Sequence, residues 1–166
     1  MHTGTDLPET LALTHPSAYQ DTVREPAQGA ALVRALIKLA RPKQWAKSGF
    51  ALVGPFYASP ELVGGEVTPA DIIVPALLTA AAFSFASSCC YTVNDLIDRE
   101  ADRLHPRKRR RPIASGAVTP GVAKLYAVAL FVLSAICVQL LPAEARGITR
   151  LCVGLYIANV FAYGFY

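Results

Sequence analysis

Three aspartates stand close together where a long apolar stretch of the sequence ends. Asp95, Asp98 and Asp102 occupy positions i, i+3 and i+7. On a continuous helix these positions point in one direction, so the carboxylates repel one another unless a cation lies between them. Mg²⁺ takes oxygen ligands from carboxylates and from the phosphates of its substrates. The spacing therefore predicts a metal–pyrophosphate site, with Asn94 as a further oxygen ligand. The alternative is a solvated polar helix end.

The apolar stretches predict the helices that position these residues. Of the 166 residues, 53% are hydrophobic and only 17% are charged. Residues 72–93 contain no charged side chain, and residues 119–141 and 148–166 form two further candidate spans. A weaker candidate, residues 48–63, is interrupted by Pro55 and Pro60. Because a run of roughly 20 apolar residues crosses a bilayer as a helix, we expect an all-α polytopic membrane helix bundle with about four transmembrane helices.

The charges between these spans predict their orientation. Lys and Arg gather in residues 34–47 and 99–118, whereas residues 59–71 carry only acidic charges and residues 142–147 carry Arg146 alone among the bases. Since basic loops stay on the cytoplasmic side, we expect a multi-pass protein of the plasma membrane with both termini cytoplasmic. Residues 1–28 are polar, contain three prolines, and are expected to form a disordered cytoplasmic tail.

An amphipathic segment precedes the first candidate span. In residues 30–41, Leu32, Leu36 and Leu39 share one helical face. Basic side chains occupy the other face, which favours a short helix lying on an anionic membrane surface. The alternative is a cytoplasmic extension of the first span.

A strongly basic loop follows the aspartates. Pro106 ends the helix and pushes His105 out of helical geometry. Five consecutive cations then occupy positions 107–111, and guanidinium and ammonium groups suit phosphate oxygens. Between membrane spans a nucleic-acid surface is not expected, although some of these cations serve to anchor the loop on the cytoplasmic side. Three roles stay open for His105: a general base, a hydrogen-bond donor to a phosphate, or a cap at the end of a helix. Thr119-Pro120 begins the next helix.

These motifs together resemble a known family. The string Asn94-Asp95-x-x-Asp98-x-x-x-Asp102, followed by Arg111-Pro112-Ile113-x-x-Gly116, is similar to the first aspartate motif of the UbiA-type intramembrane prenyltransferase superfamily. Two finer patterns resemble its decaprenyl-phosphate phosphoribosyltransferase branch, which serves cell-wall arabinan synthesis. They are His105-Pro106-x-Lys108-x-x-Arg111-Pro112-Ile113-Ala114-x-Gly116 and Arg41-Pro42-Lys43-Gln44-Trp45-x-Lys47. The resemblance covers residues 30–166.

The resemblance implies a fold and an activity. The family is a bundle of about nine membrane-spanning helices, so residues 29–166 are expected to be the N-terminal part of its transferase domain. The branch moves 5-phosphoribosyl from phosphoribosyl pyrophosphate to a polyprenyl (decaprenyl) phosphate, whose phosphate attacks the ribose carbon as pyrophosphate leaves. Asn94, Asp95, Asp98 and Asp102 would hold Mg²⁺ and the donor, with the three aspartates as the catalytic set. Asn94 would also contact the substrate, and Lys47, Lys108 and Arg111 would meet its phosphates.

The sequence also departs from the family pattern. Asp102 is the last aspartate, so the family's second aspartate motif is absent, and we expect a fragment, a split gene or a degenerate copy. A second polypeptide or a homo-oligomer would then supply the other half. Ser48-Gly49 stands where the branch more often has an asparagine after the lysine, which leaves donor contacts there open.

Three other functions remain open. The first is prenyl transfer to an aromatic or quinone precursor, although the Arg-Thr-containing loop more usual in that class is absent. The second is a CDP-alcohol-type transferase, which is disfavoured because Arg99 stands where that chemistry needs glycine. The third is a truncated membrane protein without catalytic activity.

Overall fold

The computed structural model describes residues 25–52 and 68–164, except for the side chains of residues 47, 50–52, 69 and 163–164. The elements are α2 (Gly29–Ala40), η2 (Pro42–Leu52), α4 (Pro69–Ile97), α5 (Arg99–Leu104), η3 (Lys108–Arg110), α6 (Pro120–Gln139) and α7 (Ala143–Gly164). The described ranges contain helices and no strand, which confirms the all-α prediction. The tail predicted over residues 1–28 lies almost wholly outside them.

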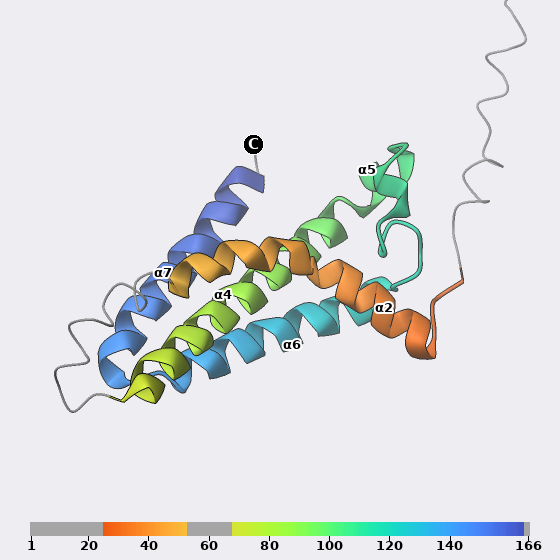
Figure 1. Cartoon of the computed structure of the whole chain (residues 1–166). Helices are drawn as coiled ribbons and strands as arrows, with labels where there is room; N and C mark the ends of the chain where they lie inside the picture. The colour runs from red at the N-terminus through yellow and green to blue at the C-terminus, as the bar shows by residue number, and fades with distance from the viewer. Residues whose placement is uncertain (1–24, 53–67, 165–166) are drawn as a thin grey trace, which may run out of the picture.

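Helix α4 is the central element, and α6 lies along it (Figure 1). The two helices approach closely because small side chains face each other: Ala82 and Ala86 are fully buried, and the Ser134 hydroxyl donates to the Ala82 carbonyl oxygen at 2.9 Å. Helix α7 packs on the same part of α4 through Val153, and η2 crosses α4. The carboxyl end of α4 and the amino end of α6 therefore meet at one end of the bundle.

Two of the helices are long and apolar enough to cross a membrane, by length and composition. They are the segment Ala70–Ile97 of α4 and the whole of α6. Large apolar side chains such as Leu77, Leu125 and Val132 are exposed on their surfaces. The weaker predicted span over residues 48–63 lies mostly outside the described residues, and α7 carries charges near its beginning. The four-span count therefore stays a prediction.

Local capping fixes where the two apolar helices begin. At the start of α4, the backbone N–H and the hydroxyl of Thr68 both donate to Asp71 Oδ2, at 2.9 and 2.7 Å. At the start of α6, Thr119 Oγ1 accepts from the Val122 N–H and Pro120 is the first helical residue. The predicted helix start at Thr119-Pro120 is confirmed.

The apolar face of α2 packs against protein. Leu39 is buried with Ile113, Val118 and Ala123, and Leu32 and Leu36 pack against this cluster. The expected placement of this face on a membrane surface is therefore corrected, because loop 111–118 and the first turn of α6 cover it. This packing fixes α2 above the end of α4 that carries the aspartates.

Candidate active site

The helix that carries the aspartates bends at Asp98. Helix α4 ends at Ile97 and α5 begins at Arg99, with Asp98 (φ −79°, ψ −2°) as the residue between them. Asp95 and Asp102 are buried, at 3% and 1% exposed, whereas Asp98 is exposed. Asp98 therefore differs from the other two predicted ligands in its exposure to solvent, and the joint role of the three carboxylates at a metal site stays a prediction.

One guanidinium joins the two buried carboxylates. Arg111 Nη1 donates to Asp102 Oδ2 at 2.7 Å and to Asp95 Oδ1 at 3.2 Å. Lys108 Nζ lies 3.9 Å from Asp102 Oδ1, and its side chain is about half exposed. A cation does lie between these carboxylates, as their mutual repulsion requires, and it is supplied by the protein. Of the predicted substrate contacts, Lys108 and Arg111 are thus brought to the aspartates.

Arg41 completes this cluster, and the sequence did not assign it a role at the site. Its Nη2 atom donates to Asp95 Oδ1 at 2.6 Å, and its guanidinium lies 4.5 Å from the centre of the Tyr91 ring. Arg41 also ends α2 in the left-handed conformation, with φ 53°, which is unusual for a residue other than glycine. Such strained residues concentrate at functional sites. The available signal was its position directly before Pro42 in the quoted motif.

The segment after the basic run is a buried turn that holds Arg111 in place. Ile113 and Ala114 are almost fully buried, and Gly116 (φ 80°) provides the left-handed residue that the turn needs. The Ser115 N–H donates to the Arg111 carbonyl oxygen at 2.9 Å. Arg103 Nε donates to the Ala114 carbonyl oxygen at 3.2 Å, which ties the turn to α5. The quoted Arg-Pro-Ile-Ala-x-Gly pattern therefore has a structural reason.

His105 adopts the geometry of a helix-end cap. Its Nδ1 atom accepts from the backbone N–H groups of Arg107 and Lys108 at 3.2 and 3.3 Å. These bonds hold the first turn of the basic loop, where Arg107, Arg109 and Arg110 are exposed. Of the three roles left open for His105, the cap is the one with contacts in the described residues.

A cavity of about 530 Å³ lies beside Tyr91, one helical turn from Asp95. Its lining combines aromatic, aliphatic and polar side chains: Gln44, Ser48, Phe83, Ser87, Tyr91, Tyr156 and Val160. The Tyr156 hydroxyl donates to Ser87 Oγ at 3.0 Å, which joins α7 to α4. The side chain of Lys47, the remaining predicted phosphate contact, lies outside the described residues although its backbone belongs to η2.

The UbiA prenyltransferase family matches residues 49–166. The chain belongs to this family.

Named UbiA-type relatives match most of the chain. A decaprenyl-phosphate phosphoribosyltransferase of Corynebacterium glutamicum is 39% identical over 153 residues, which is 91% of this chain and 43% of the relative. The enzyme of the same name in Mycobacterium tuberculosis is 40% identical over 117 residues, covering 69% of this chain and 37% of the relative. A protoheme IX farnesyltransferase of Cyanothece is 40% identical over 98 residues, or 55% of this chain and 29% of the relative. The chain therefore spans less than half the length of these relatives.

UbiA prenyltransferases are integral membrane proteins that generally use a divalent metal. Within residues 25–52 and 68–164, no group of three or more His, Cys, Asp or Glu side chains is arranged to hold a metal ion. Asp95 Oδ1 is engaged by the guanidinium groups of Arg41 and Arg111, and the two oxygens of Asp102 face Arg111 and Lys108. Asp98 is exposed and forms no ion pair with a described residue, and half-buried Asn94 lies one turn before it. The donors still available fit an ion shared with substrate phosphates, since Mg²⁺ commonly takes only one or two protein carboxylates.

Proposed function

We propose that this chain contributes the donor site of a membrane-bound transferase that moves 5-phosphoribosyl from phosphoribosyl pyrophosphate to a polyprenyl phosphate such as decaprenyl phosphate. The product would serve the synthesis of cell-wall arabinan. The proposal rests mainly on the cation-rich turn of residues 107–111. Asp95 and Asp102 hold this turn at the end of an apolar helix through their ion pairs with Arg111. The names of the Corynebacterium and Mycobacterium relatives, decaprenyl-phosphate phosphoribosyltransferases, support the choice of substrates.

The charges of the cluster support binding of a polyanion. Asp95 and Asp102 are balanced by Arg41 and Arg111, and Lys108 adds a further positive charge. The buried carboxylates therefore position the arginines, and the exposed Lys108 and neighbouring cations are available to a pyrophosphate. These groups would neutralise the charge that develops on the leaving pyrophosphate oxygen as its bond to the ribose carbon breaks. The acceptor's phosphate oxygen forms the new bond to that carbon.

Mg²⁺ belongs to the same proposal. Asp98, with Asn94 one turn earlier, would hold the ion together with the donor pyrophosphate, while Asp95 and Asp102 keep their arginine partners. When bound, the ion would withdraw charge from the leaving phosphate oxygens. In this proposal the three aspartates predicted as one metal-binding set have two roles. Asp95 and Asp102 position the cations, and Asp98 faces the donor.

A prenyl transferase acting on an aromatic or quinone precursor is the second candidate. The cavity lined by Phe83, Tyr91 and Tyr156 favours it, because aromatic side chains pack well against flat apolar ligands. The farnesyltransferase relative also favours it. Pyrophosphate leaves in both reactions, so the same cations would serve either one.

Membranes that contain the chain provide the test. Phosphoribosyl pyrophosphate and polyprenyl phosphate should yield polyprenylphosphoryl phosphoribose and pyrophosphate in a Mg²⁺-dependent reaction. The assay needs two arms, one with the chain alone and one with the chain co-expressed with the remaining part of a full-length relative. The second arm is needed because a second polypeptide or a second copy would supply the other half of the site. Prenylation of 4-hydroxybenzoate without phosphoribosyl transfer would select the second candidate. Membranes inactive in both arms and with both donors would support a protein without catalytic activity.

A further inference from the structure

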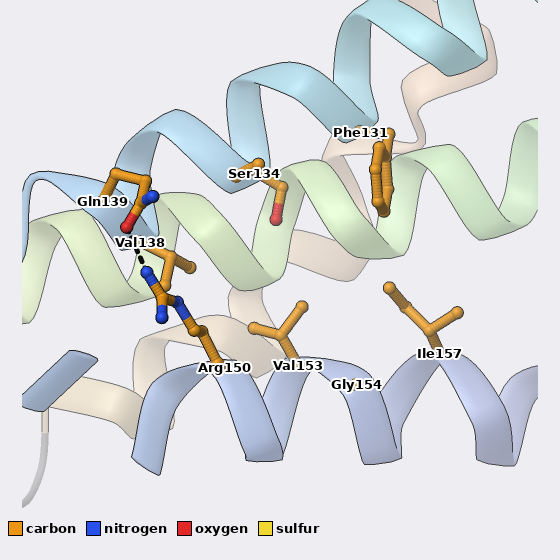
Figure 2. A pocket seen from close by; sticks show the side chains of 9 residues that line it. Phe131, Ser134, Val138, Gln139, Arg150, Val153, Gly154 and Ile157 are labelled. Atoms are coloured by element: carbon orange, nitrogen blue, oxygen red, sulfur yellow. Dashed lines mark hydrogen bonds between the residues drawn. The ribbon is translucent and has the colours of Figure 1, made fainter. Parts of the chain in front are cut away.

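A groove of about 330 Å³ separates α6 from α7 (Figure 2). It lies along the carboxyl-terminal half of α6, away from the end of the bundle where α5 follows α4 (Figure 1). This volume is within the usual range of ligand sites, about 300–1,000 Å³. The apolar side chains of Phe131, Val138, Val153 and Ile157 line it. The Arg150 guanidinium lies at one end of it, where it donates to Gln139 Oε1. The groove therefore combines an apolar body with one cationic end.

The interior of the groove has room for a hydrocarbon chain and leaves no polar group of its lining that needs a hydrogen bond from a ligand. A Cβ atom added to Gly154 would meet no other heavy atom within 4 Å, so the α7 side of the groove is open there. The one hydroxyl on the α6 side, that of Ser134, already donates to the Ala82 carbonyl oxygen at 2.9 Å. An unbranched hydrocarbon chain meets these requirements better than a polar ligand does.

The cationic end lies where phospholipid headgroups are found. Helix α6 has 20 residues, so at 1.5 Å per residue it is about as long as the hydrocarbon core is thick, roughly 30 Å. Gln139 is the last residue of α6 and therefore lies at the boundary of that core. Because Arg150 is hydrogen-bonded to Gln139, its guanidinium is at the same depth.

The charge of Arg150 is not neutralised by the described part of the chain. No carboxylate there forms an ion pair with it, and its partner is the neutral amide of Gln139. Arg146, one turn earlier, also has a neutral partner, since it donates to the Leu141 carbonyl oxygen at 2.9 and 3.2 Å, but it does not line the groove. A charge at the edge of a bilayer needs a partner of opposite sign, and lipid phosphates supply one at that depth.

We infer that this groove is a binding site for an anionic phospholipid, with the phosphate on Arg150 and one acyl chain between α6 and α7. The site is independent of the proposed transferase reaction, because it lies away from the end of the bundle where α5 follows α4 and shares no residue with the donor cluster. Its physical role is to fill the space between the two helices and to neutralise Arg150.

Native mass spectrometry of the whole chain, released from nanodiscs, tests this inference. When the nanodiscs contain phosphatidylglycerol mixed with phosphatidylcholine, the released protein should retain phosphatidylglycerol in preference to phosphatidylcholine. Arg150→Ala should lower that retention about fivefold, the equivalent of about 1 kcal/mol for one basic residue at a membrane surface. Gly154→Leu should lower it at least as much, because the new side chain fills the groove. Lys124→Ala, an exposed cation on α6, and Gly147→Leu, on α7 with equally open space, are the matched controls.

The outcomes separate the alternatives. Equal retention of both lipids, or unchanged phosphatidylglycerol retention in Arg150→Ala and Gly154→Leu, would overturn the inference. A dimer that is lost in Gly154→Leu would overturn it as well, because a second copy would then occupy the groove. Circular dichroism of each variant checks that the helices are retained. The two substitutions act on different parts of the site, the cationic end and the apolar body, so one misfolded variant leaves the other informative.

Discussion

Arg111 Nη1 lies 2.7 Å from Asp102 Oδ2, and the same nitrogen reaches Asp95 Oδ1 at 3.2 Å. One guanidinium therefore joins α4 to α5 across the bend at Asp98. This relationship turns two of the predicted catalytic aspartates into partners of protein cations. It also leaves Asp98 as the carboxylate that faces outward.

Arg111→Ala should destabilise the protein. It leaves the buried Asp102 carboxylate without its strongest partner, and breaking a buried ion pair costs about 3–5 kcal/mol. Water reaches Arg111, whose side chain is 28% exposed, so we expect about 3 kcal/mol, at the low end of that range. Denaturant unfolding in detergent measures the change. Arg109→Ala, at an exposed position of the same loop, should stay within about 0.5 kcal/mol. Equal effects of the two substitutions would contradict the described ion pairs.

The contact between Trp45 and Ser88 gives a spectroscopic prediction. Trp45 Nε1 donates to Ser88 Oγ at 2.9 Å, and that hydroxyl also lies 2.7 Å from the Ala40 carbonyl oxygen. Ser88→Ala removes the polar link between η2 and α4 and should cost about 1–2 kcal/mol. Because Trp45 is the only tryptophan, its emission should shift to longer wavelength as η2 loosens. Ser84→Ala, which loses only a bond to Ala80 within α4, should leave the emission unchanged. A shift of equal size in both variants would rule out the link.

Gly116 and Gly121 form a matched pair for the turn that holds Arg111. Gly116 has φ 80°, where an added Cβ is strained, so Gly116→Ala should lower the free energy of unfolding by about 1–2 kcal/mol. Gly121 lies in the first turn of α6 with open space around it, so alanine there should leave stability unchanged or raise it by up to about 1 kcal/mol. Thermal unfolding compares the two. A Gly116→Ala variant as stable as Gly121→Ala would show that the left-handed turn is not required.

His105 can be tested for catalysis against capping. Asparagine offers an acceptor oxygen close to the position of Nδ1, so His105→Asn should retain transferase activity and stability. His105→Ala should lose about 1 kcal/mol of stability, because the N–H groups of Arg107 and Lys108 lose their acceptor. Steady-state rates and unfolding curves measure both effects. Loss of activity in His105→Asn with unchanged stability would instead indicate a general base.

The sequence predicted local features well and the arrangement of the carboxylates poorly. Apolar runs and the Thr119-Pro120 signal placed α4 and α6, because helix length and capping are local properties. The exposure of Asp98 could not be read from its spacing, because the burial of Asp95 and Asp102 depends on contacts with distant or later residues such as Arg41 and Arg111. Arg41 was also missed as a site residue. Its contact with Asp95 joins positions 54 residues apart, and its place in the motif before Pro42 did not show which residue it would contact.

The most direct measurement compares Asp98→Asn and Asp95→Asn in the assay of phosphoribosyl transfer to polyprenyl phosphate. Glu144→Gln, an exposed carboxylate at the start of α7, is the control. We expect Asp98→Asn to lose most activity, about a hundredfold for one ligand of the ion–donor complex, while its unfolding curve stays unchanged. Asp95→Asn should lower stability before it affects the reaction, because the Arg41 and Arg111 guanidinium groups lose the carboxylate that they share. Full activity in Asp98→Asn would contradict the account.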